Sequence, residues 1–158
     1  MNRLLASTLL IFCVFIAACS NEDTEAYVNK PTAQPLNIPP LFEQLIINPV
    51  IPINNPQTVE GVALGKKLFF DRILSANNTQ ACASCHSPQK AFTDNAQFSV
   101  GIDGISGTRN SMPLFNLAWN YDEKFFWDGS VFSLEHQALE PVENPIEMNN
   151  TWEIVISR

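Results

Sequence analysis

The distribution of apolar and polar residues divides the chain into an apolar leader, a Pro-rich stretch and a longer region of short amphipathic segments. Residues 4–18 form the only long apolar run. Residues 20–57 contain seven of the eleven prolines, which predicts an extended arm, and its apolar stretch at 41–53 is placed to lie against the rest of the protein. Compact structure is therefore expected to begin near Thr58 and to continue through residues 58–158.

Start and stop signals in residues 58–158 predict short helices separated by long loops. Thr58 and Thr151 have the chemistry of N-cap residues, and Pro141 is expected to stop a helix that starts at Ser133. The predicted helices run from Thr58 to residue 70, onward from residue 79, from residue 133 to the residue before Pro141, and over residues 152–157. Residues 93–113 are rich in Gly, Ser and Asp and predict a long loop, which in a compact domain is usually functional.

The apolar leader has the features of an export signal. A basic Arg3 precedes it, and it ends in Ile16-Ala17-Ala18-Cys19. Cys19 after Ile-Ala-Ala resembles the lipobox of bacterial lipoproteins, in which the thiol is acylated and the Cys becomes the first residue of the mature protein. The alternative is an ordinary signal peptide with an incidental Cys. We expect a signal peptide at 1–18, lipidation of Cys19 and a membrane-anchored periplasmic protein.

Composition and charge exclude two classes of protein. The 158 residues are 46% hydrophobic and include 9 Lys and Arg against 16 Asp and Glu, for a net charge of −7. An acidic chain is poorly suited to neutralise phosphates, so nucleic-acid binding is not expected. The apolar run is shorter than the roughly 20 residues needed to span a bilayer, which argues against a multi-pass membrane protein.

The cysteines provide the most specific motif. Cys13 and Cys19 belong to the leader and its end, which leaves Cys82 and Cys85 with His86 directly after them. Cys-x-x-Cys-His is the attachment motif of c-type haem, in which two thiols bond to the haem vinyl groups and the His binds the iron. A disulfide or a redox-active Cys-x-x-Cys would leave His86 unexplained, and zinc would need further ligands where the chain offers only His136.

Further motifs extend this pattern over residues 60–158, which resemble the N-terminal, peroxidatic half of the bacterial dihaem cytochrome c peroxidases and their MauG-type relatives. The motifs are Leu64-Gly65-Lys66-Lys67-Leu68-Phe69-Phe70-Asp71, Cys82-Ala83-Ser84-Cys85-His86, Gly107-Thr108-Arg109-Asn110-Ser111, Phe126-Trp127-Asp128-Gly129, Gln137-Ala138 and Pro141 through Met148. The resemblance implies an all-α, cytochrome-c-like haem domain. It also implies reduction of hydrogen peroxide to water with electrons from a small redox protein such as a cytochrome c.

The resemblance also implies roles for individual residues. Glu147 corresponds to the base that moves the peroxide proton, and Gln137 to the amide that hydrogen-bonds the distal oxygen. Trp127 corresponds to the tryptophan between the two haems, Asn110 to one ligand of a calcium ion, and Arg109 to a partner of a haem propionate or an acidic protein. The alternatives are surface positions for Glu147 and Gln137, a core position for Trp127 and a structural ion pair for Arg109.

Two departures from the family pattern change the expectations. Ile102 stands where many members have a His that blocks the iron in the resting enzyme, so the iron is expected to be five-coordinate. His136 is expected at the helix surface, and neither Met112 nor Met148 matches a family ligand. A second Cys-x-x-Cys-His domain is missing from this sequence, so we expect a C-terminally truncated chain whose calcium site needs that domain.

Two other functions remain open from the sequence. A monohaem electron-transfer module would need a second axial ligand, usually a Met, and would not need Gln137 or Glu147. A MauG-like enzyme that oxidises a partner protein differs in the second haem, so the present residues do not separate it from a peroxidase.

Overall fold

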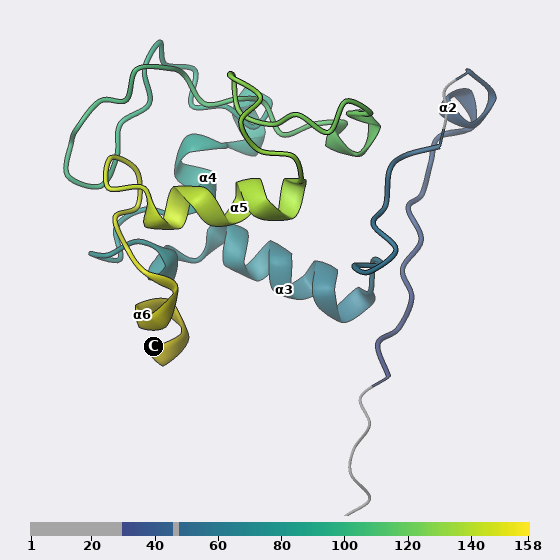
Figure 1. Ribbon diagram of the computed structural model, residues 1–158, viewed down its shortest axis with the longest axis horizontal. Coiled ribbons are helices and arrows are strands. Elements are labelled where there is room, and N and C mark those ends of the chain that lie inside the picture. Colours follow the sequence, from purple (N-terminus) through teal and green to yellow (C-terminus); the bar gives the residue numbers. More distant parts are fainter. Residues whose placement is uncertain (1–29, 46–47) are drawn as a thin grey trace, which may run out of the picture. The chain divides into compact units, whose positions relative to one another are not determined.

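The computed structural model describes residues 30–45 and 48–158 (Figure 1). Residues 31–158 cluster by their contacts into one unit. The predicted signal peptide at 1–18 and the predicted lipidation site at Cys19 lie outside the described residues. In the part of the chain that is described, no helix has both the length and the apolar character needed to cross a membrane.

The secondary structure of the described residues is helical, as expected for an all-α domain. Five α-helices and three short 3₁₀ helices (η) follow in the order α2 (Pro40–Leu45), α3 (Val59–Phe70), η1 (Arg72–Leu74), α4 (Cys82–Cys85), η2 (Pro88–Lys90), η3 (Leu117–Trp119), α5 (Leu134–Glu143) and α6 (Trp152–Ser157). Extended pairing in these residues is limited to four isolated bridges, so no sheet is formed there. The predicted long loop at 93–113 contains no helix.

Three hydroxyl side chains start the longer helices of the domain. The Thr58 side chain accepts a hydrogen bond from the Gly61 amide at 3.0 Å, which caps α3 as predicted. Thr151 caps α6, and that helix has the predicted bounds. The Ser133 hydroxyl likewise accepts from the His136 amide at the start of α5. Each cap satisfies a backbone donor that the first helical turn leaves free.

The prediction that α5 stops before Pro141 is wrong, because Pro141 lies inside the helix. Proline withholds only its own amide, and the helix continues with a hydrogen bond from the Asn144 amide to the Glu140 carbonyl at 3.0 Å. Val142, directly after the proline, is 1% exposed. Burial of this side chain stabilises the last turn of α5 against the local cost of the proline.

The helix predicted after residue 79 forms only as the single turn α4. Its last hydrogen bond runs from the His86 amide to the Cys82 carbonyl at 2.9 Å. The helix ends at Cys85, because its C-cap His86 leaves the helical region, with φ −121° and ψ 62°. Ser87 is extended, as is usual for a residue before a proline, and Pro88 begins the next 3₁₀ helix.

The Pro-rich arm is less extended than its composition predicts. It contains the short helix α2, which begins at Pro40, a residue type that suits the first position of a helix. The apolar stretch at 41–53 contacts the domain, because the Val50 amide donates to the Ala118 carbonyl at 2.7 Å. The rings of Phe42 and Trp119 also meet edge to face at 5.5 Å.

The main buried cluster joins η1 to the end of α5 and to the segment that follows α5. Leu74 comes from η1, Val142 from the end of α5, and Met148 from the segment that follows α5. Trp152 of α6 packs against this cluster, and so does Cys82 of α4. The core therefore ties the Cys-x-x-Cys-His turn to the segment that carries Glu147.

Candidate functional site

The two thiols of the Cys-x-x-Cys-His motif lie at the two ends of the single turn α4. Residues three apart on a helix share one face, so both sulfur atoms are presented together. Both cysteines are half-buried and not joined in a disulfide. Burial raises the pKa of Cys82 and Cys85, and the charges of Asp94 and Glu147 raise the pKa of Cys85 further. Protonated thiols are weak nucleophiles, which argues against a redox-active Cys-x-x-Cys.

His86 is oriented by a backbone carbonyl. Its Nδ1 lies 3.0 Å from the carbonyl oxygen of Phe92. A carbonyl only accepts, so Nδ1 carries the proton and donates, and the lone pair is on Nε2. A hydrogen bond of this kind fixes the ring and raises the basicity of the nitrogen that binds a metal.

The short hairpin after His86 brings the Phe92 carbonyl into place. Ser87 donates its amide to Thr93 at 3.1 Å and accepts from the Phe92 amide at 2.8 Å. Ala91 and Phe92 have φ angles of 52° and 58°, in the left-handed region that costs energy for residues other than glycine. Sequence reasoning missed Phe92, because its role depends on this backbone path; the Phe92 ring also contacts Phe69 of α3 at 6.3 Å.

Glu147 lies on the segment after α5, next to the buried Met148. Its amide donates to the Asn144 carbonyl at 3.0 Å, and its carbonyl accepts from the Ile102 amide at 3.0 Å. The residue is exposed, yet the surrounding protein desolvates its carboxylate enough to raise the pKa. Because its charge raises the pKa of Cys85, the carboxylate lies within electrostatic range of the attachment turn. The fold thus brings Glu147 and the Cys-x-x-Cys-His turn into one region.

Gln137 and His136 are neighbours on α5 with different environments. Gln137 is half-buried, and its side-chain amide makes no hydrogen bond to other described residues. His136 is exposed, and its Nε2 lies 2.8 Å from Glu140. The prediction of a surface position for His136 is confirmed.

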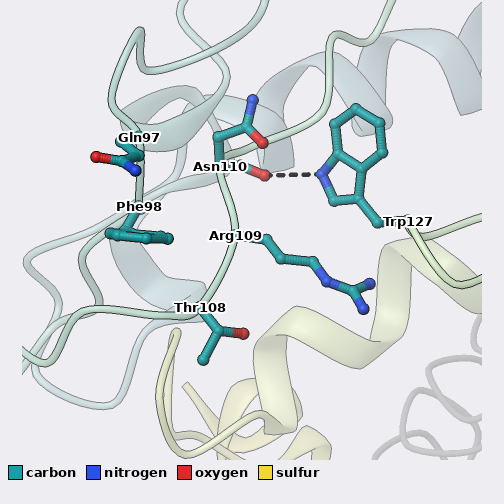
Figure 2. A pocket seen from close by; sticks show the side chains of 6 residues that line it. All are labelled: Gln97, Phe98, Thr108, Arg109, Asn110 and Trp127. Atoms are coloured by element: carbon teal, nitrogen blue, oxygen red, sulfur yellow. Dashed lines mark hydrogen bonds between the residues drawn. The ribbon is translucent and has the colours of Figure 1, made fainter.

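Three of the predicted site residues, Arg109, Asn110 and Trp127, line a hollow of about 450 Å³ (Figure 2). Its lining consists of Gln97, Phe98, Thr108, Arg109, Asn110 and Trp127. The Trp127 indole donates to the backbone carbonyl of Asn110 at 3.1 Å, as the dashed line in Figure 2 shows. Trp127 is 55% exposed, so the alternative of a core tryptophan is wrong. Arg109 lies 3.8 Å from Asp128, a surface ion pair of the kind expected to contribute little.

The described residues give little support to a calcium site at Asn110 or to Met148 as an iron ligand. Among the described residues, no three His, Cys, Asp or Glu side chains gather to hold a metal ion. Calcium needs six to eight oxygen ligands, so Asn110 supplies at most a share of such a site. Met148 is 5% exposed within the apolar core, which removes it as a candidate iron ligand.

The residues of the attachment turn fit a c-type haem. Two protonated thiols on one face and a ring nitrogen with a free lone pair form the required donor set. The described residues also bury only six apolar side chains. A core that small for this length fits a domain completed by an apolar cofactor.

Comparison with known proteins identifies the family. The family model described as di-haem cytochrome c peroxidase matches residues 59–158. Methylamine utilization protein MauG of Methylorubrum extorquens is 43% identical over 107 residues, which are 68% of this chain and 30% of that protein. Cytochrome c peroxidase Ccp of Escherichia coli is 38% identical over 109 residues, which are 68% of this chain and 23% of that protein.

A solved structure supports the same assignment. The crystal structure of a MauG-like protein associated with microbial copper homeostasis superposes with a TM-score of 0.68 at 33% identity, over 79% of this chain and 36% of that chain. The sequence therefore spans about a third or less of these relatives. The chain belongs to the di-haem cytochrome c peroxidase family, whose members bind c-type haem.

Proposed function

We propose that residues 58–158 form a peroxide-reducing haem domain, with haem c bound covalently at Cys82 and Cys85 and with His86 as the proximal ligand. The observation that carries this proposal is the hydrogen bond between His86 Nδ1 and the Phe92 carbonyl, directly after a turn with two free thiols. That bond leaves Nε2 as the nitrogen available to an iron. The chemistry that haem supplies when bound is the two-electron reduction of the oxygen–oxygen bond.

Glu147 is proposed as the group that moves the proton during this reduction. Hydrogen peroxide takes up two electrons and two protons to give two water molecules, and one oxygen must lose a proton that the other regains. A carboxylate whose pKa is raised by desolvation is closer to the working pH, so it accepts and returns a proton more readily. Gln137 is proposed to orient the distal oxygen through its uncommitted side-chain amide.

The hollow beside Trp127 is proposed to serve electron transfer rather than peroxide chemistry. Trp127 is exposed and held by Asn110, so its ring is available to a neighbouring redox group, and a small cytochrome c is the proposed electron donor. Arg109 is proposed to meet a haem propionate or an acidic partner, for which it would give up its long contact with Asp128. Calcium binding at Asn110 would need further oxygen ligands from the second haem domain.

The proposed location is the periplasm, with the mature chain anchored through lipid on Cys19. The support is the leader sequence that ends in Ile16-Ala17-Ala18. Several acyl chains on one residue anchor a protein stably, whereas a single chain binds a membrane weakly.

Oxidation of a partner protein is the second candidate function. Its support is the 43% identity with a MauG protein, and the residues proposed to bind haem would serve both reactions. A simple electron carrier is less well supported, because Met148 is in the core and Glu147 and Gln137 would have no role.

The test is the rate of reaction of the haem-loaded full-length protein with hydrogen peroxide, measured by stopped-flow absorbance. Glu147→Gln keeps the shape of the side chain but removes the base, so the second-order rate constant should fall by about 10²- to 10⁴-fold. Glu143→Gln, an exposed glutamate on α5, is the matched control and should react like the parent. A Glu147→Gln variant that reacts as fast as the parent would overturn the assignment.

A further inference from the structure

The backbone around Glu147 is held by two different parts of the fold. On the C-terminal side, the Met148 amide donates to the Pro141 carbonyl at 3.2 Å, and the Met148 carbonyl accepts from the Ala76 amide at 2.9 Å. The Met148 side chain is also in the core. Position 148 is therefore fixed by the body of the domain.

A turn at residues 101–105 of the long loop also packs against this segment, at Ile146 and Glu147. The Gly104 amide donates to the Gly101 carbonyl and the Gly101 amide to the Ile105 carbonyl, both at 3.0 Å. The Ile102 amide donates to the Glu147 carbonyl, also at 3.0 Å. The turn is thus closed on itself and bound to the residue proposed as the base.

Only a glycine fits at position 101 of this turn. A Cβ atom there would lie 1.6 Å from the carbonyl oxygen of Ile146 and 2.7 Å from its carbonyl carbon, so the two backbones would have to separate. Gly107, in the same loop, has its nearest neighbour at 3.6 Å, an ordinary contact. Close approach of two backbones therefore explains Gly101 specifically.

We propose that Gly101 is a positioning residue for Glu147, since its missing side chain lets the turn at 101–105 pack against the Ile146–Glu147 backbone. The backbone amide of Ile102 then fixes the Glu147 carbonyl. Position 102 is where the resemblance to the family expects an iron-blocking His, and here its backbone takes on a positioning role. This inference rests on the proposed role of Glu147.

The test compares peroxide reaction rates in the haem-loaded full-length protein. Gly101→Ala should lose on the order of 10²-fold, because misplacing a catalytic group by about 1 Å costs that much. The control Gly107→Ala should react like the parent. In a Glu147→Gln background, Gly101→Ala should cause no further loss, because the residue that it positions has already lost its function.

Hydrogen exchange provides a readout that does not depend on the reaction. The Ile102 amide should exchange faster in Gly101→Ala than in the parent. In Gly107→Ala it should exchange at the rate of the parent. If Gly101→Ala does not fold, Ile102→Pro removes the same hydrogen bond at a turn position that favours proline, and it should lose rate in the same way.

The outcomes separate the two proposals. If Gly101→Ala lowers the peroxide rate by the same factor in the parent and in the Glu147→Gln background, Gly101 has a general structural role. That result would overturn the positioning role and leave the proposed base untouched. A Gly101→Ala variant with the rate and exchange of the parent would do the same. A Glu147→Gln variant as fast as the parent would overturn the proposed base, and the positioning role with it.

Discussion

The attachment turn and the Glu147 segment are built in opposite ways. Between residues 82 and 93 the hydrogen bonds that orient His86 join near neighbours, and two residues with positive φ store local strain. Glu147 keeps one local hydrogen bond, to Asn144, but its carbonyl is held from outside its own segment, by the turn at 101–105, while its neighbour Met148 is held by the core. A site made of near neighbours can be recognised as a motif, whereas a site made of distant partners depends on the whole fold.

The largest expected effect of this difference is a pH dependence of the peroxide reaction rate that comes from Glu147. Burial raises the pKa of Glu147 above its usual value of 4.5, and the base must be ionised to take a proton. The peroxide rate should therefore fall as the pH decreases through this raised pKa. Stopped-flow rates across the acidic range would measure it, and Glu147→Gln should lack the decrease. A decrease that persists in Glu147→Gln would assign it to another group.

Removing the core that both regions share should weaken both together. Leu74→Ala empties part of the cluster with Val142 and Met148 and should lower the free energy of unfolding by about 2–5 kcal/mol. Urea unfolding of the haem-loaded protein measures this. Ile156→Ala, at a side chain that is 82% exposed, is the control and should change stability by less than about 0.5 kcal/mol. Equal effects at both positions would contradict the described core.

Relieving the backbone strain beside the attachment turn should stabilise the protein, in contrast to the loss of stability expected from emptying the core. Ala91 has a φ of 52°, where glycine fits without the steric cost of a Cβ atom. Ala91→Gly should therefore raise the free energy of unfolding by up to about 1 kcal/mol. Ala96→Gly, at a residue without a positive φ, should be neutral or destabilising in the same urea experiment. A loss of stability in Ala91→Gly would argue against strain at this position.

The same contrast explains what could be predicted from the sequence. The caps Thr58 and Thr151 act within one helical turn, so residue type and spacing were enough to find them. The end of α5 was misplaced because burial of Val142 outweighs the local cost of Pro141. Local residue preferences therefore predict the first residue of these helices better than the last, because packing against the core can extend a helix beyond its local stop signal.

The site residues that sequence reasoning does not identify are those that act through their backbone rather than through a side chain. Phe92 acts through its carbonyl, so its side chain carried no signal for the orientation of His86. Gly101 acts through the absence of a side chain at a contact with Ile146. A glycine in a long functional loop was the available signal, but its partner could be identified only from the fold.

Covalent attachment of haem at Cys82 and Cys85 is the claim on which the proposed function depends. The direct measurement is acid–acetone extraction of the protein produced with a cytochrome c maturation system, with the Cys82→Ser/Cys85→Ser double variant as control. Haem should remain with the parent polypeptide, because thioether bonds survive denaturation, and should be absent from the double variant or leave it. Haem that passes from the parent into the solvent would contradict covalent attachment and the assignment of the site.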